Sequence, residues 1–222
     1  MNAASPLALA VILSGRGSNM AAIAHACSNG QIAARIVRVI ADRRDAGGIA
    51  LAQRLGLEVS VVAHAEFADR EAFEAALSAA IDASGAQLVV LAGFLRILSP
   101  QFAQRYAGAM LNIHPALLPK FTGLNTHARA LQARECEHGA SVHFVTGELD
   151  AGPVVLQARI PVREEDTAES LSARVQRKEH IIYPKVIGWI AAKRLRLVGD
   201  VVYFDNRPLT EPLTHATGEL TQ

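Results

Sequence analysis

Apolar and polar residues alternate along the first half of the chain in blocks typical of strands and helices that follow one another. Leu7–Leu13 (LALAVIL) is a continuous apolar run, as expected for a parallel strand buried on both faces. The pattern predicts strands at 7–13, 36–41, 59–62, 87–92 and 110–114, and helices at 20–27, 48–55, 69–83 and 99–106. This rhythm predicts an α/β fold, a doubly wound and mostly parallel sheet with helices on both faces.

The pattern changes after residue 114. A loop rich in proline is expected at 115–125, then a short helix at 126–134, strands at 141–145 and 154–162, a long helix ending near Arg194 and a hairpin at 195–204. Asp166 and Glu169 have the spacing of a capping box at the start of the long helix, which Pro184 is expected to kink or interrupt. The polar tail after Pro212 is expected to be loose.

No repeat, linker or low-complexity block divides the chain. We therefore predict one domain over residues 1–222, with a nucleotide-binding-like half at 7–114, a second half at 115–204 and a tail at 205–222. Hydrophobic residues make up 50% of the chain and charged residues 19%, which is a globular composition. The formal net charge of +1 argues against a protein that coats nucleic acid or a membrane surface, but it leaves room for a local anion site.

The two cysteines, Cys27 and Cys136, lie far apart and outside any CxxC pair, so the sequence predicts neither a disulfide framework nor a zinc ribbon. The apolar run at 7–13 has no Lys or Arg before it and is too short to span a bilayer. These features predict a soluble, cytoplasmic protein.

The first candidate site is the loop SGRGSN, residues 14–19, between the first strand and the first helix. Glycines let backbone N–H groups approach an anion, and a helix N-terminus adds a favourable dipole. A Walker A loop would need Gly-Lys-Ser/Thr, and a dinucleotide fingerprint would need a third Gly or Ala where Met20 stands. Asp42 does end the second strand, where a ribose-binding acid would lie, so the dinucleotide alternative stays open. A single phosphate is the better fit, and an ordinary glycine-rich connection is the plain alternative.

The second candidate is Asn112-x-His114 at the end of a predicted strand. Residues two apart in a strand point to the same face, so this amide and this imidazole are expected side by side. Open α/β sheets bind ligands at the carboxyl ends of their strands, which is where the pair falls. In isolation, such a pair more often caps a loop.

The third candidate is Asp150, in the run GELDAGP. An acid before a Gly-Pro turn usually bonds its own backbone, whereas a functional role would be to orient and charge a histidine. Cys136, His138 and His143 lack a fourth ligand at zinc spacing, so no metal is expected. No GxSxG elbow is present to support a serine hydrolase.

Taken together, these segments resemble the phosphoribosylglycinamide formyltransferases, a folate-dependent family of purine synthesis. The resemblance runs from about residue 7 to 197 and rests on VILSGRGSN, LVVLAGFLRILSP, MLNIHPALLPKFTG, HGASVHFVTGELDAGPVVLQ and ARVQRKEHIIYP, in the family's order. NIHP…LLP and ELDxGP are jointly specific to folate formyltransferases. The GxGSN loop, HGASVHFVT and the chain length favour the glycinamide branch.

The resemblance implies transfer of a formyl group from 10-formyltetrahydrofolate to the amino group of phosphoribosylglycinamide, by a monomer or homodimer and without a metal. It implies a catalytic set of Asn112, His114 and Asp150. It implies that the phosphoribosyl substrate is held by Gly17, Ser18, Asn19, Gln176 and Glu179. It also implies that the 115–204 half binds the folate, together with residues from the first half. The expected formylfolate site comprises Arg70, Leu95, Arg96, Ile97, Leu98, Asn112, Thr146, Gly147, Glu148, Leu149 and Asp150. No nucleic-acid or membrane partner is implied.

Three alternatives stay open. A formyltetrahydrofolate hydrolase would carry an additional N-terminal domain, and a methionyl-tRNA formyltransferase would carry a C-terminal nucleic-acid-binding domain; we expect neither here. A noncatalytic phosphate-binding module would not need Asn112, His114 and Asp150 together.

The chain departs from the family pattern in the 115–125 loop, where Ala116, Thr122 and Asn125 replace a common Ser, Pro and His. Arg16, which varies among relatives, is expected to aid phosphate binding.

Overall fold

The computed structural model describes residues 5–215, and within this range eight strands form one sheet with the order β11-β7-β6-β5-β4-β1-β2-β3. Neighbouring strands from β3 to β5 pair in parallel. The strands of this half are β1 (Leu7–Leu13), β2 (Ala34–Ala41), β3 (Val59–Val61), β4 (Leu88–Leu91) and β5 (Met110–His114). The helices are α1 (Ser18–Ser28), α2 (Gly47–Arg54), α3 (Arg70–Ala83) and α4 (Pro100–Arg105), with a 3₁₀ turn at His64–Glu66.

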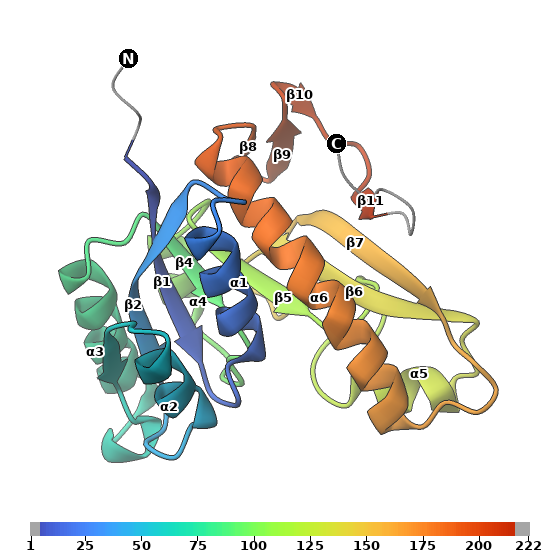
Figure 1. Cartoon of the computed structure of the whole chain (residues 1–222), viewed down its shortest axis with the longest axis horizontal. Helices are drawn as coiled ribbons and strands as arrows, with labels where there is room; N and C mark the ends of the chain where they lie inside the picture. The colour runs from blue at the N-terminus through green and yellow to red at the C-terminus, as the bar shows by residue number, and fades with distance from the viewer. Residues whose placement is uncertain (1–4, 216–222) are drawn as a thin grey trace.

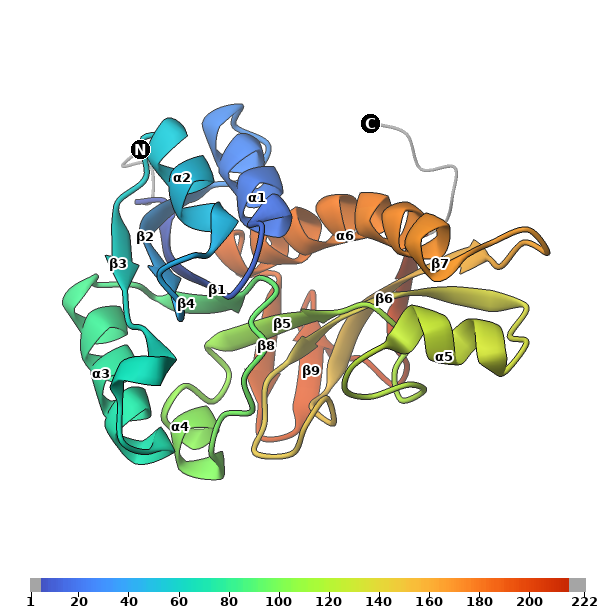
Figure 2. The ribbon, with the colours of Figure 1, turned by 90° about the horizontal axis from the view of Figure 1, so that it is seen from below.

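Helices cover both faces of this sheet because the central strands are apolar on both sides. Leu9, Val11 and Leu13 of β1 belong to one core cluster, which also contains residues of α1, α2 and the later helix α6 (Ala168–Ala191). Ala10 and Ile12 point the other way, into a cluster with residues of α3 and α4. Figure 2 shows α1, α2 and α6 on one side of the sheet and α3 and α4 on the other. The α/β, mostly parallel, doubly wound fold expected from the sequence is confirmed.

The second half extends the same sheet. β6 (Glu137–Phe144) runs antiparallel to both β5 and β7 (Val154–Pro161), and β11 (Leu213–His215) pairs in parallel with β7. α5 (Thr126–Gln132) packs against α6, which crosses the sheet diagonally in Figure 1. β8 (Leu195–Val198), β9 (Val201–Phe204) and β10 (Arg207–Pro208) form a small second sheet.

The strand order changes direction between β1 and β4, because the chain first builds outward through β2 and β3 and then returns to the other side of β1. Ligands of open α/β sheets bind in the crevice outside the carboxyl ends of the strands at such a point. The crevice is therefore expected at the carboxyl ends of the central strands, where the loops after β1 and β4 meet the end of β5.

The start of α6 differs from the expected capping box. Thr167 is the N-cap: its side chain accepts from Ser170 N, and Ser170 Oγ accepts from Thr167 N. The expected acid, Asp166, instead pairs with Arg174 at 2.5 Å. The box therefore forms one residue later than predicted, because the Arg174 guanidinium takes the Asp166 carboxylate.

Pro184 does not interrupt α6, which continues to Ala191. A proline in a helix interior removes one backbone hydrogen bond. The neighbouring Tyr183 is fully buried, and its hydroxyl lies 3.0 Å from both Leu91 O and Leu111 O, which anchors the helix to the sheet. Tertiary packing thus outweighs the local cost.

Two further expectations need correction. β6 begins at Glu137 rather than at residue 141, because it pairs with β7 along its whole length. Glycine is needed at position 139 for this pairing, since a Cβ there would lie 1.9 Å from Ala158 O. The tail after Pro212 is not loose throughout, because β11 pairs with β7. Residues 216–222 of the predicted tail lie outside the described range.

Candidate functional site

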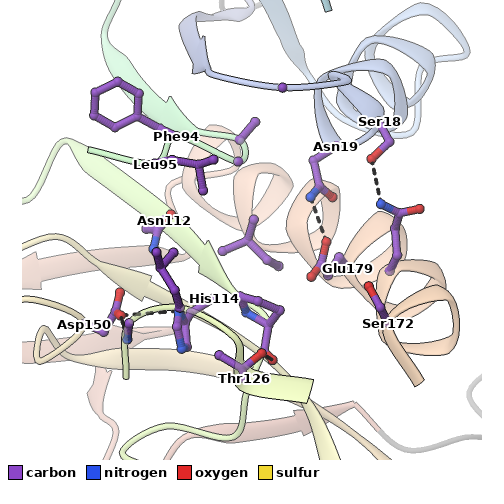
Figure 3. A pocket seen from close by; sticks show the side chains of 18 of the residues that line it. Ser18, Asn19, Phe94, Leu95, Asn112, His114, Thr126, Asp150, Ser172 and Glu179 are labelled. Atoms are coloured by element: carbon purple, nitrogen blue, oxygen red, sulfur yellow. Dashed lines mark hydrogen bonds and ion pairs between the residues drawn. The ribbon is translucent and has the colours of Figure 1, made fainter. Parts of the chain in front are cut away.

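A cavity of about 550 Å³ lies at the carboxyl ends of β1, β4 and β5. Its walls come from the loops after β1 and β4, the end of β5, the start of α5 and one face of α6 (Figure 3). A second cavity of about 80 Å³ adjoins it, and both are lined by Phe94, Arg96, Ile97, Asn112, Leu149 and Asp150. The site is therefore one crevice with a large and a small compartment.

His114 ends β5 with its side chain 6% exposed. Its Nε2 lies 2.8 Å from Phe121 O. Its Nδ1 lies 3.4 Å from Asp150 Oδ2 (Figure 3). Both ring nitrogens thus face oxygen acceptors, and a doubly protonated ring can donate to each. The Nδ1 distance is longer than a usual N–H···O hydrogen bond of about 2.7–3.2 Å. Nδ1 is consequently the less tightly hydrogen-bonded of the two ring nitrogens.

Asn112 is oriented by His143, its cross-strand partner in the β5–β6 pair. Burial lowers the pKa of His143 to about 4, so the ring is neutral at pH 7. His143 Nδ1 lies 2.9 Å from Phe144 O, to which it must donate. Nε2 then accepts from Asn112 Nδ2 at 3.1 Å. This bond fixes the Asn112 amide with its nitrogen toward His143 and leaves the second N–H of that nitrogen for a ligand.

Asp150 reaches His114 because the turn between β6 and β7 folds back over β5. Its backbone is in the left-handed region, with φ 54°, and Gly123 N donates to Oδ2 at 2.8 Å. Gly152 is required two residues later, since a Cβ there would lie 1.9 Å from Phe144 O. The carboxylate is 7% exposed and is held beside His114 by backbone geometry as well as by charge.

The glycine-rich loop adopts the tight conformation that its sequence favours. Gly17 has φ 77°, and a Cβ there would lie 2.9 Å from Gly48 Cα. α1 begins directly afterwards at Ser18, so backbone N–H groups of its first turn face the cavity. A loop of this kind with a helix start is a suitable anion site.

Ser18 and Asn19 connect the loop to α6. Gln176 Nε2 donates to Ser18 Oγ at 3.1 Å. Asn19 Nδ2 donates to Glu179 Oε2 at 2.8 Å (Figure 3). Burial raises the pKa of Glu179, while the hydrogen bond from Asn19 acts in the opposite direction. These four side chains, from two segments far apart in the sequence, form one polar wall of the large compartment.

Residues 93–98 form the opposite wall. Leu95 and Ile97 are 63% and 61% exposed, and Leu149 across the cavity mouth is 49% exposed. Leu98 and residues 145–150 line the small compartment. Exposed apolar side chains beside the polar residues that line the same crevice suit a flat aromatic ligand with hydrogen-bonding edges.

A family model described as formyl transferase matches residues 7–187, which is most of the chain. The chain belongs to the formyl transferase family. It is 46% identical to the phosphoribosylglycinamide formyltransferase of Escherichia coli over 201 residues, which are 90% of this chain and 95% of that protein. The structure of the phosphoribosylglycinamide formyltransferase of Coxiella burnetii superposes with a TM-score of 0.91 at 47% identity, covering 95% of this chain and 100% of that chain.

In this formyl transferase, the crevice brings together nearly all the site residues expected from the sequence. The large compartment is lined by Gly17, Ser18, Asn19, Leu95, Arg96, Ile97, Asn112, His114, Leu149, Asp150, Gln176 and Glu179, and the small one adds Leu98, Thr146, Gly147 and Glu148. Arg70 is the exception, because it is the first residue of α3, is exposed and lines neither compartment. Its role in folate binding stays a prediction.

Two other residues considered from the sequence, Asp42 and His138, lie outside the two compartments and contact protein side chains. Asp42 lines neither compartment and pairs with Arg96, 2.8 Å away. His138 lies against His127, with Nδ1 of His127 3.1 Å from its Nε2. Burial lowers the pKa of His138 to about 4. Among residues 5–215, no group of three or more His, Cys, Asp or Glu is placed to hold a metal ion, and no helix is long and apolar enough to cross a membrane.

Sequence reasoning missed two contributors. His143 was assigned only to a strand, and its function depends on the antiparallel register that places it opposite Asn112. The other is the carbonyl of Phe121, whose φ of 57° turns the loop toward His114. In the same loop Ala116 is fully buried, Thr122 O accepts from Arg129, and Asn125 is the left-handed N-cap of α5.

Proposed function

We propose that this formyl transferase moves a formyl group from 10-formyltetrahydrofolate to the amino group of phosphoribosylglycinamide. The similar proteins that are named phosphoribosylglycinamide formyltransferase support this pair of substrates. The observation that carries the proposal is the convergence of Asn112, His114 and Asp150 between an anion-binding loop and a compartment suited to a flat aromatic ligand. The formyl donor supplies the carbonyl carbon that the amine attacks.

Asn112 and His114 stabilise the negative charge that grows on the formyl oxygen during the attack. Asn112 offers the N–H of Nδ2 that His143 does not take, and His114 offers the weakly engaged proton on Nδ1. Preorganised donors of this kind typically contribute about 10²–10³ in turnover each. Because His143 fixes one donor and Phe121 and Asp150 fix the other, neither needs to reorganise as the charge develops.

Asp150 has two tasks. It lies 3.4 Å from His114 Nδ1 and holds the ring in position, and its carboxylate accepts the proton that the attacking amine must lose, directly or through water. The new C–N bond forms on the amine, the old C–N bond to the folate breaks, and the folate nitrogen takes a proton as it leaves. Formylglycinamide ribonucleotide and tetrahydrofolate are the products.

The walls of the crevice divide the two substrates. Gly17, Ser18 and Asn19 bind the phosphate end of the ribonucleotide through backbone N–H groups at the start of α1, while Gln176 and Glu179 contact its sugar. The pterin occupies the small compartment against the backbone of residues 95–98 and 146–150. The apolar side chains at the mouth cover the aromatic ring that follows it.

The test is to mix the protein with 10-formyltetrahydrofolate and follow tetrahydrofolate release, with and without phosphoribosylglycinamide. The proposal predicts release only when the amine is present, with formylglycinamide ribonucleotide in equal amount. Equal release without the amine would show a hydrolase. No release in either mixture, with both ligands bound, would show a noncatalytic binding protein.

A further inference from the structure

Asp42 is a fully buried carboxylate with no direct place in the crevice. It follows β2, and its side chain is 0% exposed. Its Oδ2 accepts from Arg96 Nε at 2.8 Å, across 54 residues of sequence. The side chain of Arg96 is 39% exposed and lines both compartments. The pair therefore links the interior of the sheet to the wall of the site.

Arg96 is the only ion-pair partner of Asp42 found among residues 5–215, and Asp42 Oδ1 has no hydrogen-bond partner in that range. A buried carboxylate is strongly unfavourable unless a cation and hydrogen bonds compensate it. The backbone of Asp42 is fixed too, because its N–H donates to Leu13 O at 3.2 Å and its carbonyl accepts from His64 N at 2.9 Å. Asp42 thus holds the Arg96 guanidinium in one place.

Residues 93–96 are anchored at three successive points. Ser14 N donates to Gly93 O at 3.1 Å, Leu95 N donates to Ser14 Oγ at 2.9 Å, and Arg96 Nε donates to Asp42. The first two anchors lie at the end of β1 and the third at the end of β2. The backbone of this wall is therefore held to the sheet, while the side chains of Leu95 and Ile97 stay exposed at the cavity mouth.

We propose that Asp42 is a positioning residue for the formyl donor: by binding Arg96 Nε it holds residues 93–98 in the conformation that receives the folate. The proposal rests on the function proposed above. Because Asp42 touches neither compartment, it acts through Arg96. Its loss changes donor binding and leaves the ribonucleotide wall, on α1 and α6, intact.

The first experiment compares Asp42→Asn with the wild type in steady-state kinetics. Asn keeps the shape and an oxygen that can accept from Arg96 Nε, but it removes the negative charge and with it the attraction between the buried carboxylate and the guanidinium. We expect KM for 10-formyltetrahydrofolate to rise about tenfold. We expect kcat and KM for the ribonucleotide to change less than about twofold.

The matched control is Asp45→Asn, which removes an exposed carboxylate that pairs only with Arg43 among the described ion pairs. It should leave both KM values at the wild-type level. Thermal unfolding of each variant, measured without ligands, reports stability separately. An unchanged donor KM in Asp42→Asn, or equal rises in both KM values, overturns the proposal.

A double-mutant cycle tests the route through Arg96. Asp42→Asn, Arg96→Met and the double variant are compared for the donor KM. The double variant should match Arg96→Met alone, because the effect of Asp42 needs the guanidinium. If Asp42→Asn still adds its full factor when combined with Arg96→Met, the route through Arg96 is wrong. A wild type without amine-dependent transfer would refute the proposed function instead, so the two failures are distinguishable.

Discussion

Acidification should destabilise the fold through His143, and the variant His143→Gln should lack this part of the loss. Burial lowers the pKa of His143 from its ordinary value of 6.5 to about 4. The neutral ring donates to Phe144 O and accepts from Asn112 Nδ2. Between pH 6.5 and 4 the unfolded chain binds a proton that the folded chain does not, so stability falls as the pH falls.

The two pKa values set the magnitude. A difference of about 2.5 between them corresponds to about 3.4 kcal/mol in full, and linkage gives a loss of about 2 kcal/mol at pH 5 relative to pH 7.5. Gln places an amide oxygen near the position of Nε2 and can still accept from Asn112, but it does not titrate. The variant should therefore keep most of the turnover while losing this pH dependence.

The assay is urea unfolding of both proteins at several pH values between 7.5 and 4.5. His138, whose pKa is also about 4, contributes equally to both proteins, so their difference isolates His143. The wild type should lose about 2 kcal/mol more than the variant between pH 7.5 and 5. Identical pH profiles would refute the assignment of a buried, neutral His143 and, with it, the orientation of Asn112.

Three further predictions concern separate parts of the molecule. Gly152→Ala places a Cβ against Phe144 O, so urea unfolding should show a loss of about 3 kcal/mol, whereas an unchanged midpoint would show that the turn is free to move. Gln176→Ala removes the bond to Ser18, so KM for the ribonucleotide should rise about tenfold with the donor KM unchanged; a rise in the donor KM alone would contradict the division of the crevice. Thr167→Ala removes the N-cap of α6 and should cost about 1 kcal/mol in unfolding free energy, with turnover unaffected; no loss would show that the cap is dispensable.

The parallel half of the fold could be predicted from the sequence because its signals are local. Buried parallel strands are continuous apolar runs, and glycines after helices mark their ends, as Gly56 does after α2 with φ 70°. β11 could not be predicted, since three residues carry little local signal and their pairing with β7 depends on contacts distant in the chain. The same holds for α6, where the packing of Tyr183 outweighs the local effect of Pro184.

In the candidate site too, contacts within one strand could be predicted from the sequence, whereas contacts between distant segments could not. The spacing of Asn112 and His114 in one strand was sufficient to predict that they lie together at the sheet edge. Asp150, 36 residues beyond His114, was tied to it by resemblance alone, and the β6–β7 turn accounts for the 3.4 Å approach. His143 depends on the antiparallel register of β5 and β6, which no motif encodes.

Single-turnover formyl transfer by His114→Ala shows directly whether His114 stabilises the charge on the formyl oxygen. The variant is loaded with 10-formyltetrahydrofolate and phosphoribosylglycinamide, and formylglycinamide ribonucleotide is followed over time beside the wild type. Loss of the donor on Nδ1 should slow transfer by at least about 10²-fold, with an unfolding midpoint close to that of the wild type. Transfer at a near-normal rate in the folded variant would contradict the assignment of His114 and the mechanism built on it.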